Sequence, residues 1–367
     1  MTPKSLVLVQ VADRTLEPRE FPIPAIGAED ALLKVERCGI CGSDVEQYYG
    51  HLTVARYPLI PGHEPLGTIA QIGDKAAARW GVDVGDRVVV ESGVPCRACR
   101  YCQNGQFNSC PNQQRIGYTP LDGTMRLTGG FAQYLHLPPN ATVHKISKQV
   151  SLDVAATFNA MACGVGWAVH AAGTKLNDTV VILGAGQRGL ASLVAAKAVG
   201  AGTTIMTGLS RDRHKLEMAK RLGADHVIDV ETENVREAVR SLTGGELADI
   251  VLDLVPFATE TVADAVDIVK PGGRIVLAGV KGKNQTVKTL VTDAIVTKSI
   301  TIKGALGKDS AAYRQAVRIL ESARYPLEML HTHCLPLERA ADAIEILAGN
   351  RPDIGRAPIC VSLEPPH

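Results

Sequence analysis

Four cysteines lie within 15 consecutive positions, and their spacing is the most specific chemical signal in the chain. They are Cys96, Cys99, Cys102 and Cys110. Four thiolates complete the tetrahedral coordination of zinc and leave no open position. The nine cysteines of the chain are an odd number, which argues against a fully disulfide-paired scaffold. The spacing therefore predicts a structural zinc ion that helps the polar loop to fold; reduced, unliganded thiols are the alternative.

A second group of potential metal ligands is dispersed along the chain. Cys41 begins a Cys-Gly-Ser-Asp segment, His63 and Glu64 follow a glycine, and Cys163 lies between Ala162 and Gly164. Two thiolates and one imidazole suit zinc and leave a fourth position for water or a substrate. A metal at such an open site can act as a Lewis acid on whatever oxygen binds there. Each residue alone is a weak signal, because a lone buried cysteine is usually a small hydrophobic residue.

A glycine-rich turn follows the apolar run 180–183 and precedes a helical pattern. It reads Gly184-Ala185-Gly186-Gln187-Arg188-Gly189. In this G-x-G-x-x-G pattern, the first glycine permits the tight turn, the second admits a pyrophosphate and the third allows close packing of helix and strand. The free N–H groups at the start of the helix then face the phosphates. The turn, with Gln187 and Arg188 in it, predicts dinucleotide binding; a turn used only for packing is the alternative.

The next strand indicates which dinucleotide is bound. An acidic residue about 20 positions after the glycine turn normally binds the ribose hydroxyls. Here the strand 203–207 ends at Gly208, and Ser210 and Arg211 follow. A carboxylate would repel a 2′-phosphate, whereas glycine leaves room for it and serine and arginine can bind it. The sequence therefore favours NADP(H) over NAD(H); the alternative is that Arg211 is a solvated residue at the start of the next helix.

The elements that must position these residues change in character along the chain. Residues 1–150 hold short strand-like runs broken by proline and glycine, which predicts a β-rich domain with long loops. From about residue 178, strands and helices alternate, which predicts a parallel sheet covered on both faces. A chain of 367 residues is also too long for one compact core. The fold class expected is α/β, with two domains.

Composition excludes several classes of function. The formal net charge is +1, so the chain has no basic excess for contacts with nucleic acid. No run of about 20 apolar residues indicates a membrane span. The first residues lack the long apolar core and cleavage site of a secretory signal, so we expect a cytoplasmic protein.

Taken together, these motifs resemble the zinc-dependent medium-chain alcohol dehydrogenase family. The resemblance covers nearly the whole chain and extends to the segments 85–88, 129–132 and 270–273. It implies a chaperonin-10-like catalytic domain from residues 1–153 and 307–367, with a Rossmann domain at 154–306 inserted between them. It further implies two zinc ions per chain, one structural and one catalytic.

The resemblance also assigns roles to the dispersed residues. Cys41, His63 and Cys163 match the catalytic zinc ligands, and Glu64 matches a carboxylate beside the metal that can replace one of them. The match of Cys163 rests on its distance from Val169-His170, since related subgroups carry Glu or Asp at the position of Cys163. Arg356 matches a contact to the cofactor pyrophosphate, with a surface arginine as the alternative.

Shortly after Cys41, two residues match the family's catalytic machinery around the metal and a third departs from it. Ser43 matches the hydroxyl that passes the alcohol proton outward, although a turn serine is the alternative. Asp44 matches a residue that orients a ligand histidine. Glu46 departs from the family pattern, because many members carry a relaying histidine there. Glu46 itself or the nearby His51 can take over that relay.

These inferences predict an oxidoreductase that transfers a hydride between NAD(P) and an alcohol/carbonyl pair. The small Ser92 favours a secondary or cyclic alcohol, and the partners expected are an alcohol and its ketone or aldehyde. The segment 300–302 resembles a family dimer edge, which predicts a homodimer or homotetramer. The rival enzyme is a zinc-free quinone or enoyl reductase of the same fold, which would lack Cys41, His63 and the four-cysteine loop. A zinc-ribbon-like binding module and a catalytically silent protein are the remaining alternatives.

Overall fold

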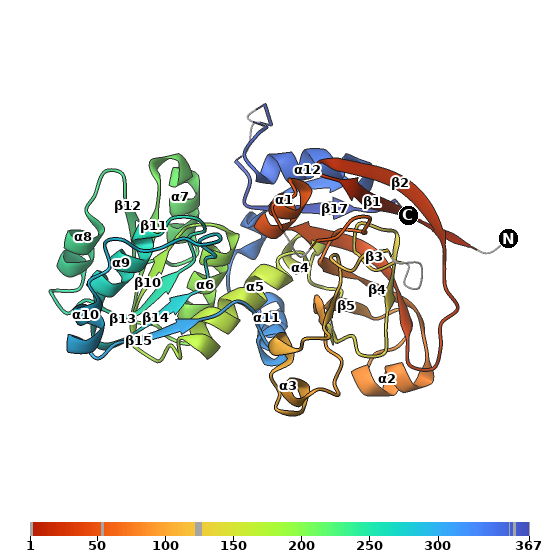
Figure 1. Ribbon diagram of the computed structural model, residues 1–367, viewed down its shortest axis with the longest axis horizontal. Helices are drawn as coiled ribbons and strands as arrows, with labels where there is room; N and C mark the ends of the chain where they lie inside the picture. Colours follow the sequence, from red (N-terminus) through yellow and green to blue (C-terminus); the bar gives the residue numbers. More distant parts are fainter. Residues whose placement is uncertain (1–2, 53–54, 122–126, 352, 355–356, 367) are drawn as a thin grey trace. The chain divides into compact units, whose positions relative to one another are not determined.

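The computed structural model describes residues 3–52, 55–121, 127–351, 353–354 and 357–366. It divides into two compact units (Figure 1). The terminal unit combines Met1–Asn159 with Glu328–His367, and the central unit is Ala160–Leu327. The domain boundaries expected after residues 153 and 306 stay a prediction.

The terminal unit is rich in β-structure, as its short strand-like runs predict. Its main sheet has the order β16-β17-β3-β4-β5-β9, with β8 also paired to β3, while β1 with β2 and β6 with β7 form separate antiparallel pairs. Its strands are β1 (Lys4–Ala12), β2 (Thr15–Pro22), β3 (Ala31–Ile40), β4 (Glu64–Ile72), β5 (Arg87–Val90), β6 (Gly93–Val94), β7 (Gln114–Arg115), β8 (Tyr134–Leu137), β9 (Val143–Lys145), β16 (His331–Pro336) and β17 (Cys360–Glu364). Its helices are α1 (Gly42–Tyr48), α2 (Asp74–Trp80), α3 (Arg100–Gln103), α4 (Leu152–Ala155) and α12 (Ala340–Leu347).

The pairing of β3 with β4 brings two distant segments together. The antiparallel register places Gly39 opposite Glu64. Cys41 follows the end of β3 and precedes the first turn of α1, while His63 immediately precedes β4. β3 is largely buried and pairs with β4, β8 and β17. Its apolar residues therefore fix this register by packing into the core. A register shift of one residue would turn the apolar side chains of β3 away from the core.

The central unit holds the predicted parallel sheet, in the order β12-β11-β10-β13-β14-β15. The strands are β10 (Thr179–Leu183), β11 (Thr203–Gly208), β12 (His226–Asp229), β13 (Ala248–Asp253), β14 (Val269–Leu277) and β15 (Thr301–Gly304). The run 180–183 is buried throughout, because a parallel sheet has helices on both faces. The expected α/β fold with a β-rich second unit is confirmed.

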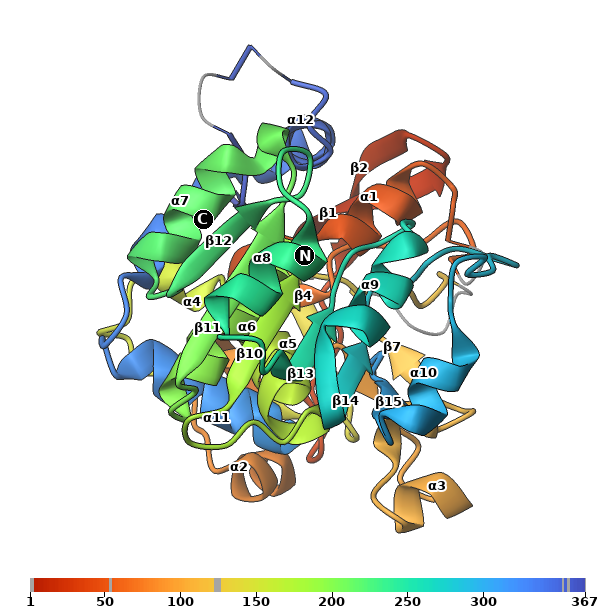
Figure 2. The same cartoon turned by 90° about the vertical axis from the view of Figure 1, so that its left-hand side faces the viewer.

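The helices of the central unit are α5 (Phe158–Gly164), the π-helix η2 (Val165–Ala171), α6 (Gln187–Ala198), the 3-10 turn η3 (Ser210–Asp212), α7 (Arg213–Arg221), α8 (Val235–Leu242), α9 (Glu260–Ile268), α10 (Thr292–Thr297) and α11 (Ser310–Glu321). α6 packs on β10 and β11 and against η2, while α9 packs on β13 and β14 and contacts α8 and α10. Figure 2 shows the parallel strands of this sheet side by side. Among the residues described, no helix has the length and apolar character needed to cross a membrane.

Candidate functional site

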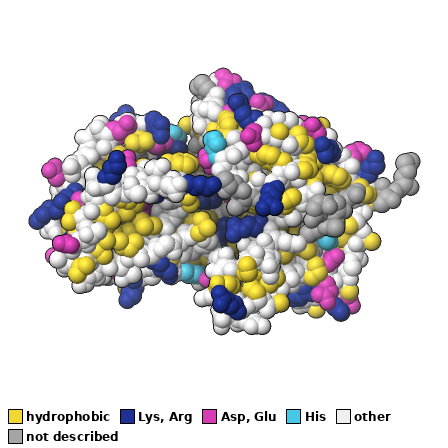
Figure 3. Space-filling model, viewed as in Figure 1, with side chains coloured by type: hydrophobic (Ala, Val, Ile, Leu, Met, Phe, Trp, Pro, Cys, Tyr) yellow, Lys and Arg dark blue, Asp and Glu magenta, His cyan; other side chains and the backbone are white. Residues whose placement is uncertain are grey.

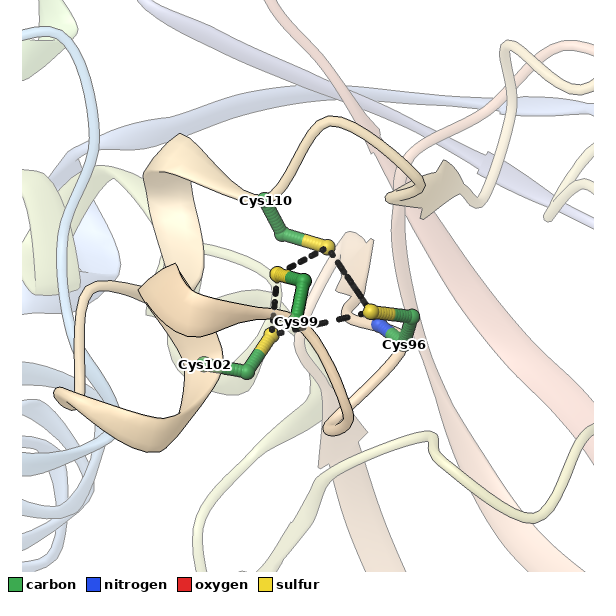
Figure 4. Close-up of side chains that lie close together, drawn as sticks. All are labelled: Cys96, Cys99, Cys102 and Cys110. Atoms are coloured by element: carbon green, nitrogen blue, oxygen red, sulfur yellow. Dashed lines mark hydrogen bonds between the residues drawn. The ribbon is translucent and has the colours of Figure 1, made fainter.

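The four clustered cysteines turn their thiols toward a common centre (Figure 4). They lie in the loop that joins β6 to β7, and α3 supplies one of them. The Sγ–Sγ distances are 3.5 Å for Cys96–Cys110, 3.6 Å for Cys99–Cys102, 3.8 Å for Cys99–Cys110 and 4.0 Å for Cys96–Cys102. A tetrahedral zinc with bonds of about 2.3 Å separates its sulfurs by about 3.8 Å. The four thiols therefore fit a closed zinc site and lie too far apart for disulfide bonds.

The backbone of this loop also prepares the thiols for a cation. The N–H groups of Ala98 and Cys99 face the Cys96 thiol and lower its pKa to about 6. The backbone N–H of Cys96 in turn donates to Cys110 Sγ at 3.4 Å. Desolvation raises the pKa of Cys102 to about 12, so the four thiols differ in how readily they ionise. Metal binding requires all four as thiolates, which makes the metal the group that completes this loop.

The second cluster comprises Cys41, Asp44 and His63, all of them buried. His63 Nε2 lies 3.2 Å from Cys41 Sγ and 3.4 Å from Ser43 Oγ. Cys41 Sγ and Ser43 Oγ are 2.7 Å apart. A tetrahedral zinc would hold its sulfur and nitrogen ligands about 3.6 Å apart. The two donor atoms thus need to separate by only a few tenths of an ångström to hold a zinc ion.

Asp44 fixes the orientation of the histidine in this cluster. Its Oδ1 lies 3.1 Å from His63 Nδ1, while its Oδ2 accepts from the backbone N–H of Cys41 at 2.9 Å. A proton on Nδ1 leaves the lone pair of Nε2, the nitrogen that faces Cys41, free for a metal, which is the arrangement of a metal-bound histidine. Burial alone disfavours the imidazolium, but the charge of Asp44, with Tyr118 and Cys41, holds the pKa of His63 well above its ordinary value. Asp44 thus faces the nitrogen that a metal would not use.

Glu64 lies on the other side of His63 and has a partner that the sequence did not indicate. Its Oε1 is 3.5 Å from His63 Nε2 and accepts from Asn159 Nδ2 at 2.5 Å. A Cβ on Gly39 would lie 2.6 Å from Glu64 Oε2, so the facing strand needs glycine at that position. Asn159 and Gly39 therefore hold a buried carboxylate next to the candidate metal ligands.

Tyr118 is a second residue that sequence reasoning missed. Its hydroxyl donates to Ser43 Oγ at 3.1 Å and lies 3.2 Å from His63 Nδ1, and burial raises its pKa to about 12. The preceding residue, Gly117, has a φ of +80°, and a Cβ there would lie 2.7 Å from the backbone of Gly62. This close approach of two glycines lies next to Tyr118 and His63, and because the glycines are far apart in the sequence, the contact could not have been found from it.

Glu46 and His51, the two alternatives expected for the proton relay, contact each other. His51 Nδ1 lies 3.1 Å from Glu46 Oε2, and the imidazole is stacked on Tyr49 with 5.9 Å between the ring centroids. The His51 side chain is 62% exposed and that of Glu46 is 30% exposed, so the pair can exchange protons with solvent. Cys163 lies buried in α5 of the central unit, and its role as the third zinc ligand stays a prediction.

The glycine-rich turn has the geometry that its pattern predicts. Gly184 has a φ of +103°, which favours glycine, and a Cβ on Gly189 would lie 2.0 Å from the Gly184 carbonyl. Gly186 precedes the first turn of α6, whose first residues are Gln187 and Arg188. The Arg188 guanidinium lies over the Trp167 ring, 5.6 Å from its centroid.

Two carboxylates, one at the end of β12 and one just after it, lie at the end of β11. Gly208 is the last residue of β11, and it pairs with Asp229 of β12. Ser210 Oγ donates to Asp229 Oδ2 and the Ser210 backbone N–H donates to Glu231 Oε2, both at 2.7 Å. Arg211 is exposed in η3. Arg356, expected at the cofactor pyrophosphate, lies outside the described residues.

Each of the two units contains a segment that matches a known protein family. Residues 27–148 match the alcohol dehydrogenase GroES-like domain, and residues 189–322 match the zinc-binding dehydrogenase family. A Mycobacterium tuberculosis protein named as a probable alcohol dehydrogenase is 41% identical, over 94% of each chain. The erythritol/L-threitol dehydrogenase of Mycolicibacterium smegmatis is 32% identical, over 94% of this chain and 93% of its own.

A solved structure gives the same result for the fold. The alcohol dehydrogenase of Thermotoga maritima has a TM-score of 0.89 at 27% identity, covering 99% of this chain and all of its own. Both candidate metal clusters and both family matches thus point to a zinc-containing dehydrogenase. The chain belongs to the zinc-containing medium-chain alcohol dehydrogenase family and is a zinc-dependent, NAD(P)-linked enzyme.

Proposed function

We propose that this enzyme transfers a hydride between a nicotinamide dinucleotide and the secondary carbinol of a small alcohol, either cyclic or polyhydroxylated. The observation that carries the proposal is the convergence of Cys41, Ser43 and His63, with Asp44 behind the histidine. The small Ser92 favours a secondary over a primary alcohol, and the name of the M. smegmatis relative refers to polyol substrates.

The roles proposed for the individual side chains follow from this geometry. Cys41 and His63 would hold zinc, with Cys163 as the third ligand and Glu64 as its substitute. A bound zinc supplies Lewis-acid polarisation of the substrate oxygen. Ser43 accepts the proton that the alcohol gives up, because its hydroxyl lies beside both ligand atoms. Asp44 fixes the ligand form of the imidazole.

The test is a zinc count with a substrate panel. Two zinc ions per chain and oxidation of secondary or cyclic alcohols are expected. One zinc or none, together with reduction of quinones or enones, would instead support the zinc-free reductase of the same fold. Polyols and simple secondary alcohols of equal carbon number should be compared, because they differ only in the extra hydroxyls that polar groups such as Tyr118 would bind.

We propose that Glu46 and His51 release the substrate proton to solvent. Their contact at 3.1 Å and their exposure support this path. Glu46→Gln should change the dependence of kcat on pH, because an amide cannot carry the proton. An unchanged profile would remove Glu46 from the relay and leave His51 to be tested alone by His51→Gln.

For the cofactor we propose NADP(H), supported by Gly208 at the end of β11 and the exposed Arg211 beyond it. NAD(H) is a second candidate, because Asp229 and Glu231 already bind Ser210 and would repel a 2′-phosphate there. The ratio of kcat/KM for the two cofactors decides between them. If NADP(H) is preferred, Arg211→Ala should lower that preference; if NAD(H) is preferred, the double variant Asp229→Asn with Glu231→Gln should weaken it.

We further propose a cytoplasmic homo-oligomer assembled through the edge strand β15. Large hydrophobic side chains near this strand are exposed, among them Val291 at 64%, Val296 at 77% and Leu306 at 74%. Figure 3 shows hydrophobic side chains gathered over α10, β14 and β15. Light scattering should give a dimer or tetramer for the wild type, and Val296→Asp should shift it toward the monomer.

A further inference from the structure

A buried ion pair lies at the carboxyl end of β13. Asp253, the last residue of that strand, is fully buried, and the Lys281 side chain is 15% exposed. Lys281 Nζ lies 2.9 Å from each carboxylate oxygen of Asp253, and it also donates to the Val255 carbonyl at 2.6 Å and to Thr261 Oγ1 at 2.9 Å. The ammonium thus has an acceptor for every N–H. A buried ion pair often adds little net stability to a fold, so stability alone does not explain why this pair is present.

The pair joins two loops that leave neighbouring strands. The Asp253 carbonyl accepts from the backbone N–H groups of Ala278 and Gly279, which follow β14, at 3.0 Å each. A Cβ on Gly279 would lie 2.3 Å from the Val255 carbonyl, so these backbones are in close contact. Lys281 comes two residues later and binds that same Val255 carbonyl. Its side chain therefore fastens the loop after β14 to the loop after β13.

These loops lie where the strand order of the sheet reverses. β10 lies between β11 and β13, and ligands of open α/β sheets bind outside the carboxyl ends of the strands at such a point. The Leu254 N–H donates to the Leu183 carbonyl at 3.1 Å, and Val255 Cγ2 would touch a Cβ on Gly184 at 3.0 Å. The loop after β13 thus contacts the glycine turn directly.

The position of the turn indicates which half of the cofactor meets these loops. The pyrophosphate belongs at the start of α6, and the adenosine ribose belongs at the end of β11. The nicotinamide half must then extend over the ends of β13 and β14. We propose that Lys281 is a positioning residue for this half: it holds the two loops in the shape that binds the nicotinamide and its ribose. The inference rests on the dinucleotide-dependent function given above.

The test compares a complete cofactor with one that lacks nicotinamide. Calorimetric titration would use whichever of NADH and NADPH the wild type binds more tightly, and the matching ADP-ribose or its 2′-phosphate. Lys281→Met should weaken binding of the reduced cofactor about tenfold, the equivalent of one or two hydrogen bonds, and leave the ADP-ribose Kd within about twofold. Lys283→Met, at an exposed lysine in the same loop, is the matched control and should change neither value.

A second variant covers the case in which the unpaired Asp253 prevents folding. The double substitution Asp253→Asn with Lys281→Met removes both charges and should show the same selective loss. A folded variant with unchanged binding of both ligands, or with equal losses for both, would overturn the positioning role. A wild-type chain that binds neither dinucleotide would overturn the cofactor function itself, and this inference with it.

Discussion

The four-cysteine loop and the Cys41–His63 cluster are two metal sites built in opposite ways. In the loop, four ligands lie within 15 residues and the thiols enclose one centre. In the cluster, Cys41 and His63 come from segments 22 positions apart, and the pairing of β3 with β4 brings them together. We therefore expect the loop to depend on its metal for its shape, whereas the pairing of β3 with β4 shapes the cluster.

This difference matches the chemistry of each site. A site with four protein ligands has no room for a substrate, so it contributes to folding only. A site with fewer protein ligands keeps a position open, and the surrounding hydroxyl and carboxylate groups can then act on whatever binds there. Variants at the two sites should therefore separate stability from activity.

The largest expected effect is on activity, at the open site. His63→Ala should lower kcat/KM by roughly 10⁴-fold, because a Lewis acid contributes several kcal/mol and each 1.4 kcal/mol is tenfold in rate. Its thermal midpoint should stay near that of the wild type, since the sheet holds the site. His136→Ala, at another histidine paired with a carboxylate in the same unit, is the control and should remain active. Comparable activity in both variants would refute the catalytic assignment.

The second effect is on stability, at the closed site. Cys99→Ser should remove one zinc ion per chain and lower the free energy of unfolding by about 4 kcal/mol, because the polar loop loses the group that organises it. Thermal unfolding and zinc analysis measure the two changes, with Cys334→Ser, at an exposed cysteine, as the control. A variant that keeps its stability but loses as much activity as His63→Ala would contradict the division of roles.

The two sites also differ in how far the sequence could predict them. The closed site could be predicted from the spacing of Cys96, Cys99, Cys102 and Cys110. Its ligands are close in the sequence, so they can be recognised without knowing how distant segments pack together. The parallel sheet and its glycine turn were predictable for a similar reason, since both follow from local patterns. Tyr118, Asn159 and Lys281 were not predictable, because each acts on a partner that only strand pairing brings near.

Asp44→Asn tests how strongly the open site depends on a neighbour that is not a ligand. Zinc affinity or activity should decrease by about 10-fold to 100-fold, since the imidazole loses the carboxylate that fixes its tautomer. Competition with a chelator measures the affinity. No such dependence is expected for the Cys₄ loop, where the ligands alone define the geometry. An unchanged zinc affinity and an unchanged kcat would show that Asp44 only caps α1.

Tyr118→Phe tests a smaller contribution at the same site. Removing one hydroxyl that donates to Ser43 should lower kcat between about 2-fold and 10-fold, as expected for a hydrogen bond worth 0.5–1.5 kcal/mol. Zinc content should not change. Tyr101→Phe, in the four-cysteine loop, is the matched control and should leave kcat unaltered. A loss of zinc in Tyr118→Phe would mean that the tyrosine supports His63 rather than Ser43.

The smallest effect concerns acid, which releases zinc from both sites by protonating their ligands. The central unit provides the contrast, because no metal cluster lies among its described residues. Desolvation opposes the charge of Asp225 there, but hydrogen bonds from Thr204 and the charge of Lys197 lower its pKa from the ordinary value of an aspartate. A carboxylate whose pKa is lower in the folded than in the unfolded state stabilises the fold above the unfolded-state pKa. This contribution is lost as the pH falls through the folded-state pKa.

Asp225→Asn should therefore be slightly less stable than the wild type at pH 7, and the difference in urea midpoint should vanish in acid. The effect is small because the carboxylate is 36% exposed and screened. A difference that persists below the folded pKa would mean that the packing of Asp225, and not its charge, stabilises β11.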